Sequence, residues 1–233
     1  MKPQLDILAF GAHPDDVEIG MAGTLVKHQR AGMSIGICDL TYAEMSSNGS
    51  VELRQQEAAQ AGSHMGLTMR LTIGLPDRGL QPIKEQLDQL VRVIREYRPR
   101  LVFAPYWEDR HPDHVVCSRM VQEAVFNAKL RKYMPELPAH QVENTLFYFI
   151  NDTVPCDLMV DVSDVYPYKR LALESYASQF TAPADSQDVV ATPLNQGYVE
   201  RVEARDSLLG QARGIPYAEG FMQKGPYVVQ SFL

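Results

Sequence analysis

Short apolar runs alternate with segments of helical periodicity along the first half of the chain. The runs at 5–11, 34–40, 69–75 and 101–105 predict buried strands, and 145–150 and 158–162 predict two more. Apolar residues at helical spacing predict helices over 17–31, 51–65, 82–97 and 112–129. The last third is less periodic, with helices expected at 165–178 and 196–209.

This alternation of strand and helix predicts an α/β protein with a Rossmann-like three-layer fold, in which helices cover both faces of a mostly parallel sheet. No internal repeat, low-complexity linker or shift in composition divides the 233 residues. We therefore expect a single domain over 1–233.

Polar clusters follow three of the expected strands, at 13–16, 41–54 and 106–114. In open α/β sheets, ligands bind beyond the carboxyl ends of the strands, so these clusters should meet at one edge. A dinucleotide site would need glycines in the first turn, whereas this turn holds His13, Pro14, Asp15 and Asp16. Two carboxylates would repel a phosphate but suit a divalent cation, which disfavours a nicotinamide cofactor.

The third cluster contains a second group of metal-binding residue types. Pro112 fits the first turn of a helix, and His111 and His114 are three residues apart, so both can face one side. Imidazole and carboxylate together are typical ligands of Zn²⁺, although iron or cobalt could use the same set. Taken singly, Asp15 or Asp16 could be a helix cap and His111 a structural loop histidine. The coincidence of both clusters favours a metal site.

Neighbouring aspartates cannot easily bind one small ion together. If either Asp15 or Asp16 is a ligand, the other is free to act as a base. The spacing alone does not assign the two roles.

The composition limits the kinds of binding partner and the cellular compartment that can be expected. The formal charge is −7 and the basic residues are scattered, which disfavours nucleic acid and anionic membranes as partners. The three cysteines form no C-x-x-C pair, so we expect a reducing environment. Neither a signal peptide nor an apolar run long enough to span a bilayer is recognisable, and a cytoplasmic protein is expected.

Several of these segments also occur together in a known family. The segments are distributed along nearly the whole chain. They are AHPDD at 12–16, SSNG at 46–49, LRQQEA at 53–58, LPDRG at 75–79, HPDH at 111–114 and YAEGF at 217–221. In these motifs the sequence resembles the LmbE-like (PIG-L) N-acetylglucosamine deacetylases. It is most similar to the branch that removes acetate from N-acetylglucosaminyl-L-malate in bacillithiol biosynthesis.

The resemblance implies a role for each residue of the site. His13, Asp16 and His114 would bind one Zn²⁺ per chain, and Asp15 would be the general base. His111 would stabilise the oxyanion, with Asp113 orienting a histidine from behind.

On the substrate side, the resemblance places Arg54 against the sugar, and Tyr198 is a candidate second oxyanion donor. Arg110, and also Arg78, could bind an anionic group such as malate. Asn48 lies either at the rim of the site or simply in a turn.

Alternatives to the malate glycoside stay open. The same motifs would serve a general N-acetylglucosamine or chitooligosaccharide deacetylase, or an amidase acting on thiol conjugates. A noncatalytic metal-binding α/β module would not need the second carboxylate. The family tendency, together with an aromatic tail at 217–233, predicts a homo-oligomer, with a hexamer as the specific expectation.

Overall fold

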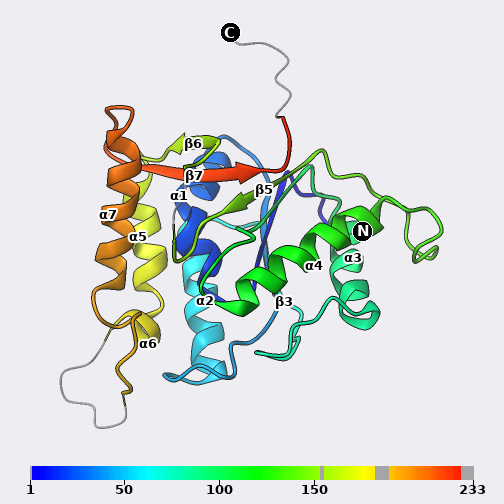
Figure 1. Ribbon diagram of the computed structural model, residues 1–233, viewed down its shortest axis with the longest axis horizontal. Coiled ribbons are helices and arrows are strands. Elements are labelled where there is room, and N and C mark those ends of the chain that lie inside the picture. Colours follow the sequence, from blue (N-terminus) through cyan, green and yellow to red (C-terminus); the bar gives the residue numbers. More distant parts are fainter. Residues whose placement is uncertain (1, 153–154, 182–188, 227–233) are drawn as a thin grey trace.

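The computed structural model describes residues 2–152, 155–181 and 189–226, and it contains a seven-stranded sheet in the order β3-β2-β1-β4-β5-β7-β6 (Figure 1). The strands are β1 (Ile7–Gly11), β2 (Ile35–Asp39), β3 (Met69–Thr72), β4 (Leu101–Pro105), β5 (Asn144–Tyr148), β6 (Leu158–Asp161) and β7 (Ala218–Gln223). The helices are α1 (Asp16–Arg30), α2 (Val51–Met65), α3 (Lys84–Tyr97), α4 (Pro112–Ala128), α5 (Tyr166–Glu174), α6 (Ala177–Phe180) and α7 (Tyr198–Gln211).

The sheet is mostly parallel, which confirms the predicted α/β class. Strands β1 to β5 pair in parallel, with Ile7 opposite both Ile35 and Leu101. Strand β7 runs antiparallel to β5 and β6 and lies between them. The sequence pattern missed β7 because a buried Glu219 and Gly220 interrupt its apolar residues.

Two apolar cores lie on opposite faces of the sheet. One contains side chains of α1, α2, α5 and α7, and the other contains side chains of α3 and α4. Successive residues of a strand point to opposite faces, so Ile7 and Ala9 of β1 join the first core while Leu8 and Phe10 join the second. Strand β1 is therefore apolar along its whole length, as the predicted three-layer arrangement requires.

Two predicted helices are not continuous. The helix expected over 165–178 divides into α5 and α6 at Tyr176, whose ψ of 57° is not helical and whose ring is fully buried. Helix α1 is broken at Met21, where φ is −155° and ψ is 20°. A pattern of apolar spacing detects the faces of these helices but not the interruptions in their hydrogen bonding.

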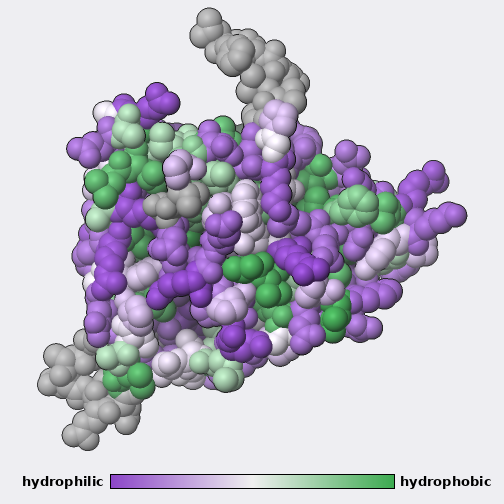
Figure 2. Space-filling model, in the orientation of Figure 1, coloured by the Kyte–Doolittle hydropathy of each residue, from purple (hydrophilic) through white to green (hydrophobic). Residues whose placement is uncertain are grey.

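The surface is mostly polar on the face shown in Figure 2, where apolar residues form separate patches. Within the described ranges, no helix has the length and apolar character needed to cross a bilayer. The tail at 217–233 is described as far as Pro226, and residues 227–233 lie outside the described part. The predicted homo-oligomer stays a prediction.

Gly20 provides a test of the packing between α1 and the sheet. A Cβ atom at this position would overlap Cδ2 of Tyr148 and lie 2.9 Å from the backbone oxygen of Phe149. We expect Gly20→Ala to lower the free energy of unfolding by about 1–3 kcal/mol through overpacking. Urea denaturation followed by circular dichroism would measure the change.

Gly62→Ala is the matched control, since its added Cβ would meet only the flexible side chain of Leu67, at 3.3 Å. There, alanine improves helix propensity, so little or no loss of stability is expected. Equal effects of the two substitutions would contradict the packing argument.

Candidate active site

The candidate site lies where the order of the strands reverses. The chain proceeds from β1 outwards to β2 and β3 on one side and to β4 and β5 on the other. Loops leaving β1 and β4 therefore diverge at this point and leave an opening between them. An open cleft of about 560 Å³ lies there and includes residues from the loops after all five parallel strands. The predicted convergence of the polar clusters is thus confirmed.

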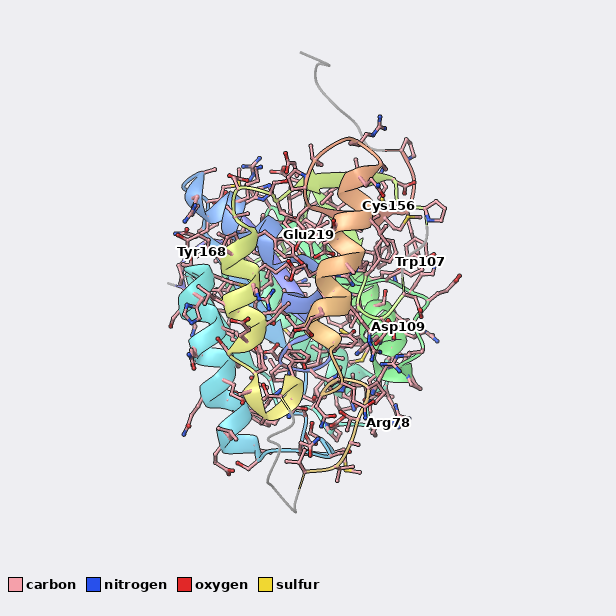
Figure 3. All side chains as sticks on the ribbon, turned by 90° about the vertical axis from the view of Figure 1, so that its left-hand side faces the viewer. Arg78, Trp107, Asp109, Cys156, Tyr168 and Glu219 are labelled. Carbon is pink, nitrogen blue, oxygen red and sulfur yellow. The ribbon has the colours of Figure 1, made fainter. Side chains whose placement is uncertain are left out.

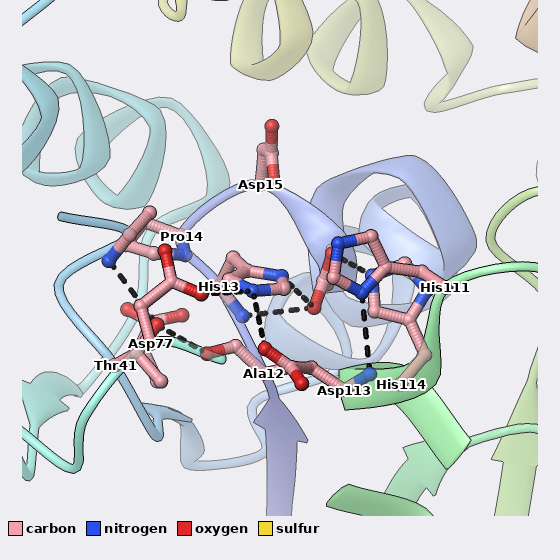
Figure 4. Close-up of polar contacts among 12 residues, drawn as sticks. Ala12, His13, Pro14, Asp15, Thr41, Asp77, His111, Asp113 and His114 are labelled. Atoms are coloured by element: carbon pink, nitrogen blue, oxygen red, sulfur yellow. Dashed lines mark hydrogen bonds and ion pairs between the residues drawn. The ribbon is translucent and has the colours of Figure 1, made fainter. Parts of the chain in front are cut away.

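Asp16 joins the loops after β1 and β4. Its carboxylate accepts a hydrogen bond from the backbone amide of His13 at 2.9 Å. The same carboxylate lies 3.5 Å from Nδ1 of His13 and 3.1 Å from Nε2 of His114. His13 and His114, which are about 100 residues apart in sequence, therefore lie close together (Figure 4), and one buried carboxylate contacts both.

Further carboxylates lie behind the two histidines. Nε2 of His13 is 3.2 Å from Asp77 and 3.6 Å from Asp113, while Nδ1 of His114 is 3.0 Å from Asp109. Each carboxylate can accept the proton of one ring nitrogen and so leave the other nitrogen as a ligand facing the cleft. Asp113, which was expected to orient a histidine, lies beside His13, and this role stays a prediction.

Asp77 and Asp109 were not identified as site residues from the sequence. Asp77 lies within LPDRG after β3, and Asp109 lies two residues before His111. Their positions just beyond parallel strands could have indicated them, but nothing in the spacing shows which histidine each one contacts.

Arg78 fixes Asp113 in place. Its backbone amide donates to Oδ2 of Asp113 at 2.9 Å, and its Nη1 donates to Oδ1 at 2.8 Å. Arg78 has a φ of 59°, in the left-handed region, which turns the loop so that both donors reach the carboxylate. Burial alone would raise the pKa of Asp113, but its contacts with His13 and Arg78 lower it to about 2.

The buried charges set the protonation of the histidine and aspartate groups. Burial alone would lower the pKa of His114, but Asp16 and Asp109 raise it to about 9. His13 behaves alike, since burial is outweighed by nearby carboxylates and its pKa lies well above the usual value. Burial would raise the pKa of Asp16, but the two imidazoles hold it well below the usual range. The carboxylates around His13 and His114 therefore favour the binding of positive charge, either as protons or as a cation.

Asp15 has a different environment from its neighbour. It precedes α1 with a φ of 127°, in a region that residues other than glycine rarely adopt, and its side chain makes no capping hydrogen bond. Its Oδ2 instead accepts from Nη2 of Arg54 at 2.7 Å. Burial raises the pKa of Asp15 to about 7, against the lowering effect of Arg54. Asp15 therefore stands at the N-cap position of α1, but its carboxylate contacts Arg54 and does not cap the helix.

His111 caps helix α4 and also lines the cleft. As the N-cap of α4, its Nδ1 accepts from the backbone amide of Asp113 at 3.2 Å. The neutral ring then carries its proton on Nε2, where it can serve as a donor. Burial, followed by the nearby charge of His114, lowers the pKa of His111.

The remaining predicted residues, Arg54, Asn48, Tyr198 and Arg110, all line the cleft, although their free polar groups differ. Nη1 of Arg54 is buried and has no hydrogen-bond partner among the described residues. The amide of Asn48 is occupied, since it donates to Val190 O at 2.9 Å and accepts from Val190 N at 2.8 Å. It thus ties the segment beginning at 189 to the cleft, and its substrate contact stays a prediction.

Tyr198 is the first residue of α7, and Arg110 lies in the loop between β4 and α4. The hydroxyl of Tyr198 is 3.2 Å from Ile150 O and 3.3 Å from Oδ1 of Asn151. Arg110 is exposed and forms no ion pair with a residue in the described ranges. Their predicted contacts with substrate stay predictions, although both side chains border the cleft.

The donors of the site fit a divalent metal. His13, His111 and His114 each offer one ring nitrogen, and these three atoms lie within 4.8 Å of one another. His13, Asp77 and Asp113 form a second such group. Imidazole nitrogens and carboxylate oxygens, buried and supported from behind, are the ligand set of a metal centre with an open position.

The fold and the site together define an α/β protein with a candidate His/Asp metal site at the strand switch point. Residues 8–125, about half of the chain, match the family described as PIG-L, GlcNAc-PI de-N-acetylase. The chain belongs to this family. It is therefore an enzyme of the deacetylase class, a hydrolase of amide bonds, and the noncatalytic alternative is wrong.

Relatives of several kinds resemble the chain over most of its length. It is 28% identical to the diacetylchitobiose deacetylase of Thermococcus kodakarensis, over 92% of this chain and 81% of that protein. It is 27% identical to the probable N-acetyl-alpha-D-glucosaminyl L-malate deacetylase 2 of Bacillus anthracis, over 77% and 84%. The crystal structure of the conserved protein TT1542 from Thermus thermophilus superposes with a TM-score of 0.90 at 37% identity and covers 99% of both chains.

The carboxylate behind His114 gives a test of the metal centre. We expect Asp109→Asn to weaken Zn²⁺ binding by about 10- to 100-fold, because the amide no longer fixes the ring through a charged acceptor. Competition with a chromogenic chelator would measure the dissociation constant.

Glu108→Gln is the control, since it makes the same change of charge at the exposed neighbouring residue. It should bind Zn²⁺ as the unchanged protein does. If the two variants had the same affinity, the supporting role of Asp109 would be disproved.

Proposed function

We propose that this enzyme is a zinc-dependent deacetylase of N-acetylglucosamine derivatives, with N-acetylglucosaminyl-L-malate as its substrate. The observation that carries the proposal is the pair of adjacent carboxylates with different surroundings. Asp16 lies between two histidines, whereas Asp15 lies beside Arg54 on the wall of the cleft. A metal ligand and a general base are thus available next to each other.

We assign His13, Asp16 and His114 as the metal ligands. Asp16 contacts both histidines, while Asp77 and Asp109 can hold the outer nitrogens of the two rings. This arrangement leaves Nδ1 of His13 and Nε2 of His114 as the ligand atoms. Bound there, Zn²⁺ would acidify water and polarise the acetyl carbonyl.

Asp15 is the proposed general base. It accepts a proton from the attacking water as the new carbon–oxygen bond forms at the acetyl carbonyl. Its hydrogen bond to Arg54 and its pKa of about 7 suit a group that gains and loses a proton near neutral pH. Return of the proton to the departing nitrogen, as the carbon–nitrogen bond breaks, yields acetate and a free amine.

His111 is the proposed donor to the oxyanion. Because its Nδ1 accepts from a backbone amide, the proton lies on Nε2, and its lowered pKa keeps the ring neutral. Such a fixed donor typically lowers the barrier by a few kcal/mol. Tyr198, which also lines the cleft, is the candidate for a second donor.

The polar groups of the cleft support a sugar substrate with an anionic substituent. The unpartnered Nη1 of Arg54 offers a donor to a sugar oxygen. Beside the cleft lies a further hollow of about 510 Å³, whose lining includes Arg110 and Arg201 together with Tyr198. A carboxylate such as those of malate would meet positive charge there.

The similarity to a diacetylchitobiose deacetylase favours a neutral chitooligosaccharide as the second candidate substrate. A thiol-conjugate amide is a third. The charge of the group attached to the sugar is the property that separates the first two.

Asp15→Asn tests the proposed base. We expect kcat for acetate release from N-acetylglucosaminyl-L-malate to fall by about 10²- to 10⁴-fold, because the amide cannot accept the proton. Zinc content, measured by atomic absorption, should stay the same. Retention of full activity would exclude Asp15 as the base, whereas loss of zinc would make it a ligand.

Arg110→Gln tests the anionic subsite. We expect KM for the malate glycoside to rise by about tenfold or more, since a hydrogen bond to a charged group contributes about 1.5–3 kcal/mol. The kinetics with N,N′-diacetylchitobiose should change little. Acetate release from both substrates would be followed over a range of concentrations.

Arg119→Gln serves as the control, because Arg119 is an exposed arginine of α4 paired with Glu123. It should leave both substrates unaffected. If the unchanged enzyme preferred diacetylchitobiose, the malate glycoside would be rejected as the substrate.

A further inference from the structure

A break in α1 separates its first turn from the rest of the helix. Met21 has a φ of −155° and a ψ of 20°, so the regular hydrogen bonding stops there. A break of this kind frees amides at the start of the second segment and carbonyls at the end of the first. Buried groups of this kind need other partners.

Glu219 of β7 binds the freed amides. Its Oε1 accepts from Gly23 N at 3.0 Å and its Oε2 accepts from Thr24 N at 2.6 Å. A carboxylate at the start of a helical segment also interacts favourably with the helix dipole. Glu219 therefore acts as an N-cap supplied by a strand that lies 196 residues further along the chain.

Arg205 of α7 binds the freed carbonyl end. Its Nη2 donates to Ile19 O at 2.7 Å, and its Nη1 donates to Ile150 O at 3.0 Å. Ile19 and Ile150 both line the cleft. One largely buried arginine side chain thus connects the first turn of α1 to the wall that follows β5.

Two further charges complete a quartet of Lys169, Arg205, Asp206 and Glu219. Nζ of Lys169 lies 2.7 Å from both Glu219 and Asp206, and Asp206 accepts from Arg205 at 3.0 Å. The quartet has two positive and two negative members, and it lies among α1, α5 and α7, where Glu219 is visible in Figure 3.

Stability alone does not account for the quartet. Removing charged groups from water costs several kcal/mol per ion, and apolar residues of similar volume often serve as well. The quartet also provides directional hydrogen bonds. Arg205 binds the helical segment before the break at Met21, and Glu219 binds the segment after it.

We infer that Glu219 and Arg205 are positioning residues that fix the break in α1 and thereby hold its first turn, with Asp16, in the active site. The inference rests on the proposed function, in which Asp16 is a metal ligand. Arg205 also binds the backbone oxygen of Ile150, and the neighbouring Asn151 donates to Asp109 at 2.8 Å. Because Asp109 contacts Nδ1 of His114, the quartet also helps to position His114.

Arg205→Met is the principal test, with Arg95→Met as the matched control. Arg95 is a buried arginine that also binds backbone carbonyls, but it lies on α3 at the opposite face of the sheet. We expect Arg205→Met to weaken Zn²⁺ binding by about tenfold and to lower kcat more than it changes KM. Arg95→Met should lower Tm while both Zn²⁺ affinity and kcat stay unchanged.

Arg205→Lys provides a second variant in case the methionine variant does not fold. It keeps the charge but cannot reach Ile19, Ile150 and Asp206 together, so its Zn²⁺ affinity should also fall. Wild-type affinity and kcat in a folded Arg205 variant would overturn the inference. The same holds if Arg95→Met reduced both quantities equally.

Amide exchange of Gly23 and Thr24 tests the cap without metal or substrate. In Glu219→Gln these two amides should exchange at least about tenfold faster than in the wild type, while the core amides of β1 keep their protection. Unchanged exchange would refute the cap. Failure of the wild type to release acetate from any N-acetylated sugar would defeat the proposed function and leave this measurement valid.

Discussion

The carboxylate of Asp16 is the group on which the geometry of the active site depends. It is almost fully buried and contacts His13 from the loop after β1 and His114 from the first turn of α4. A buried anion is costly unless it is paired and hydrogen-bonded, and here both conditions are met by residues of the site itself. The contacts that stabilise this charge are therefore the same contacts that bring the two motifs together.

Asp15 and Asp16 are adjacent residues of one type, but their carboxyl groups have opposite pKa shifts. The two imidazoles keep Asp16 ionised, whereas burial beside a single guanidinium raises the pKa of Asp15 to about 7. Environments that separate the pKa values of two carboxyl groups are a feature of acid–base sites. The backbone makes the separation possible, because the φ of 127° at Asp15 directs its side chain towards Arg54.

The sequence predicted the layers of the fold and the convergence of the motifs, because both depend on local patterns. Apolar runs identify the parallel strands, and the loops at their carboxyl ends must share one edge of the sheet. Asp77 and Asp109 could not be assigned in this way, since their contacts with His13 and His114 depend on the conformation of irregular loops. The occupied amide of Asn48 was unpredictable for the same reason.

Strand β7 and the break in α1 escaped prediction for a common physical reason. Neither can be recognised in its own part of the sequence, since Glu219 and Gly220 interrupt the apolar residues of the strand and Met21 lies within a regular helical pattern. In the folded protein the two features pair with each other, because the carboxylate of Glu219 in β7 accepts hydrogen bonds from the amides that the break in α1 leaves free. Sequence patterns describe elements one at a time, and they cannot show a pairing whose partners are separated by almost the whole chain. The first turn of α1, which carries Asp16, thus becomes fully supported only when β7 has entered the sheet between β5 and β6.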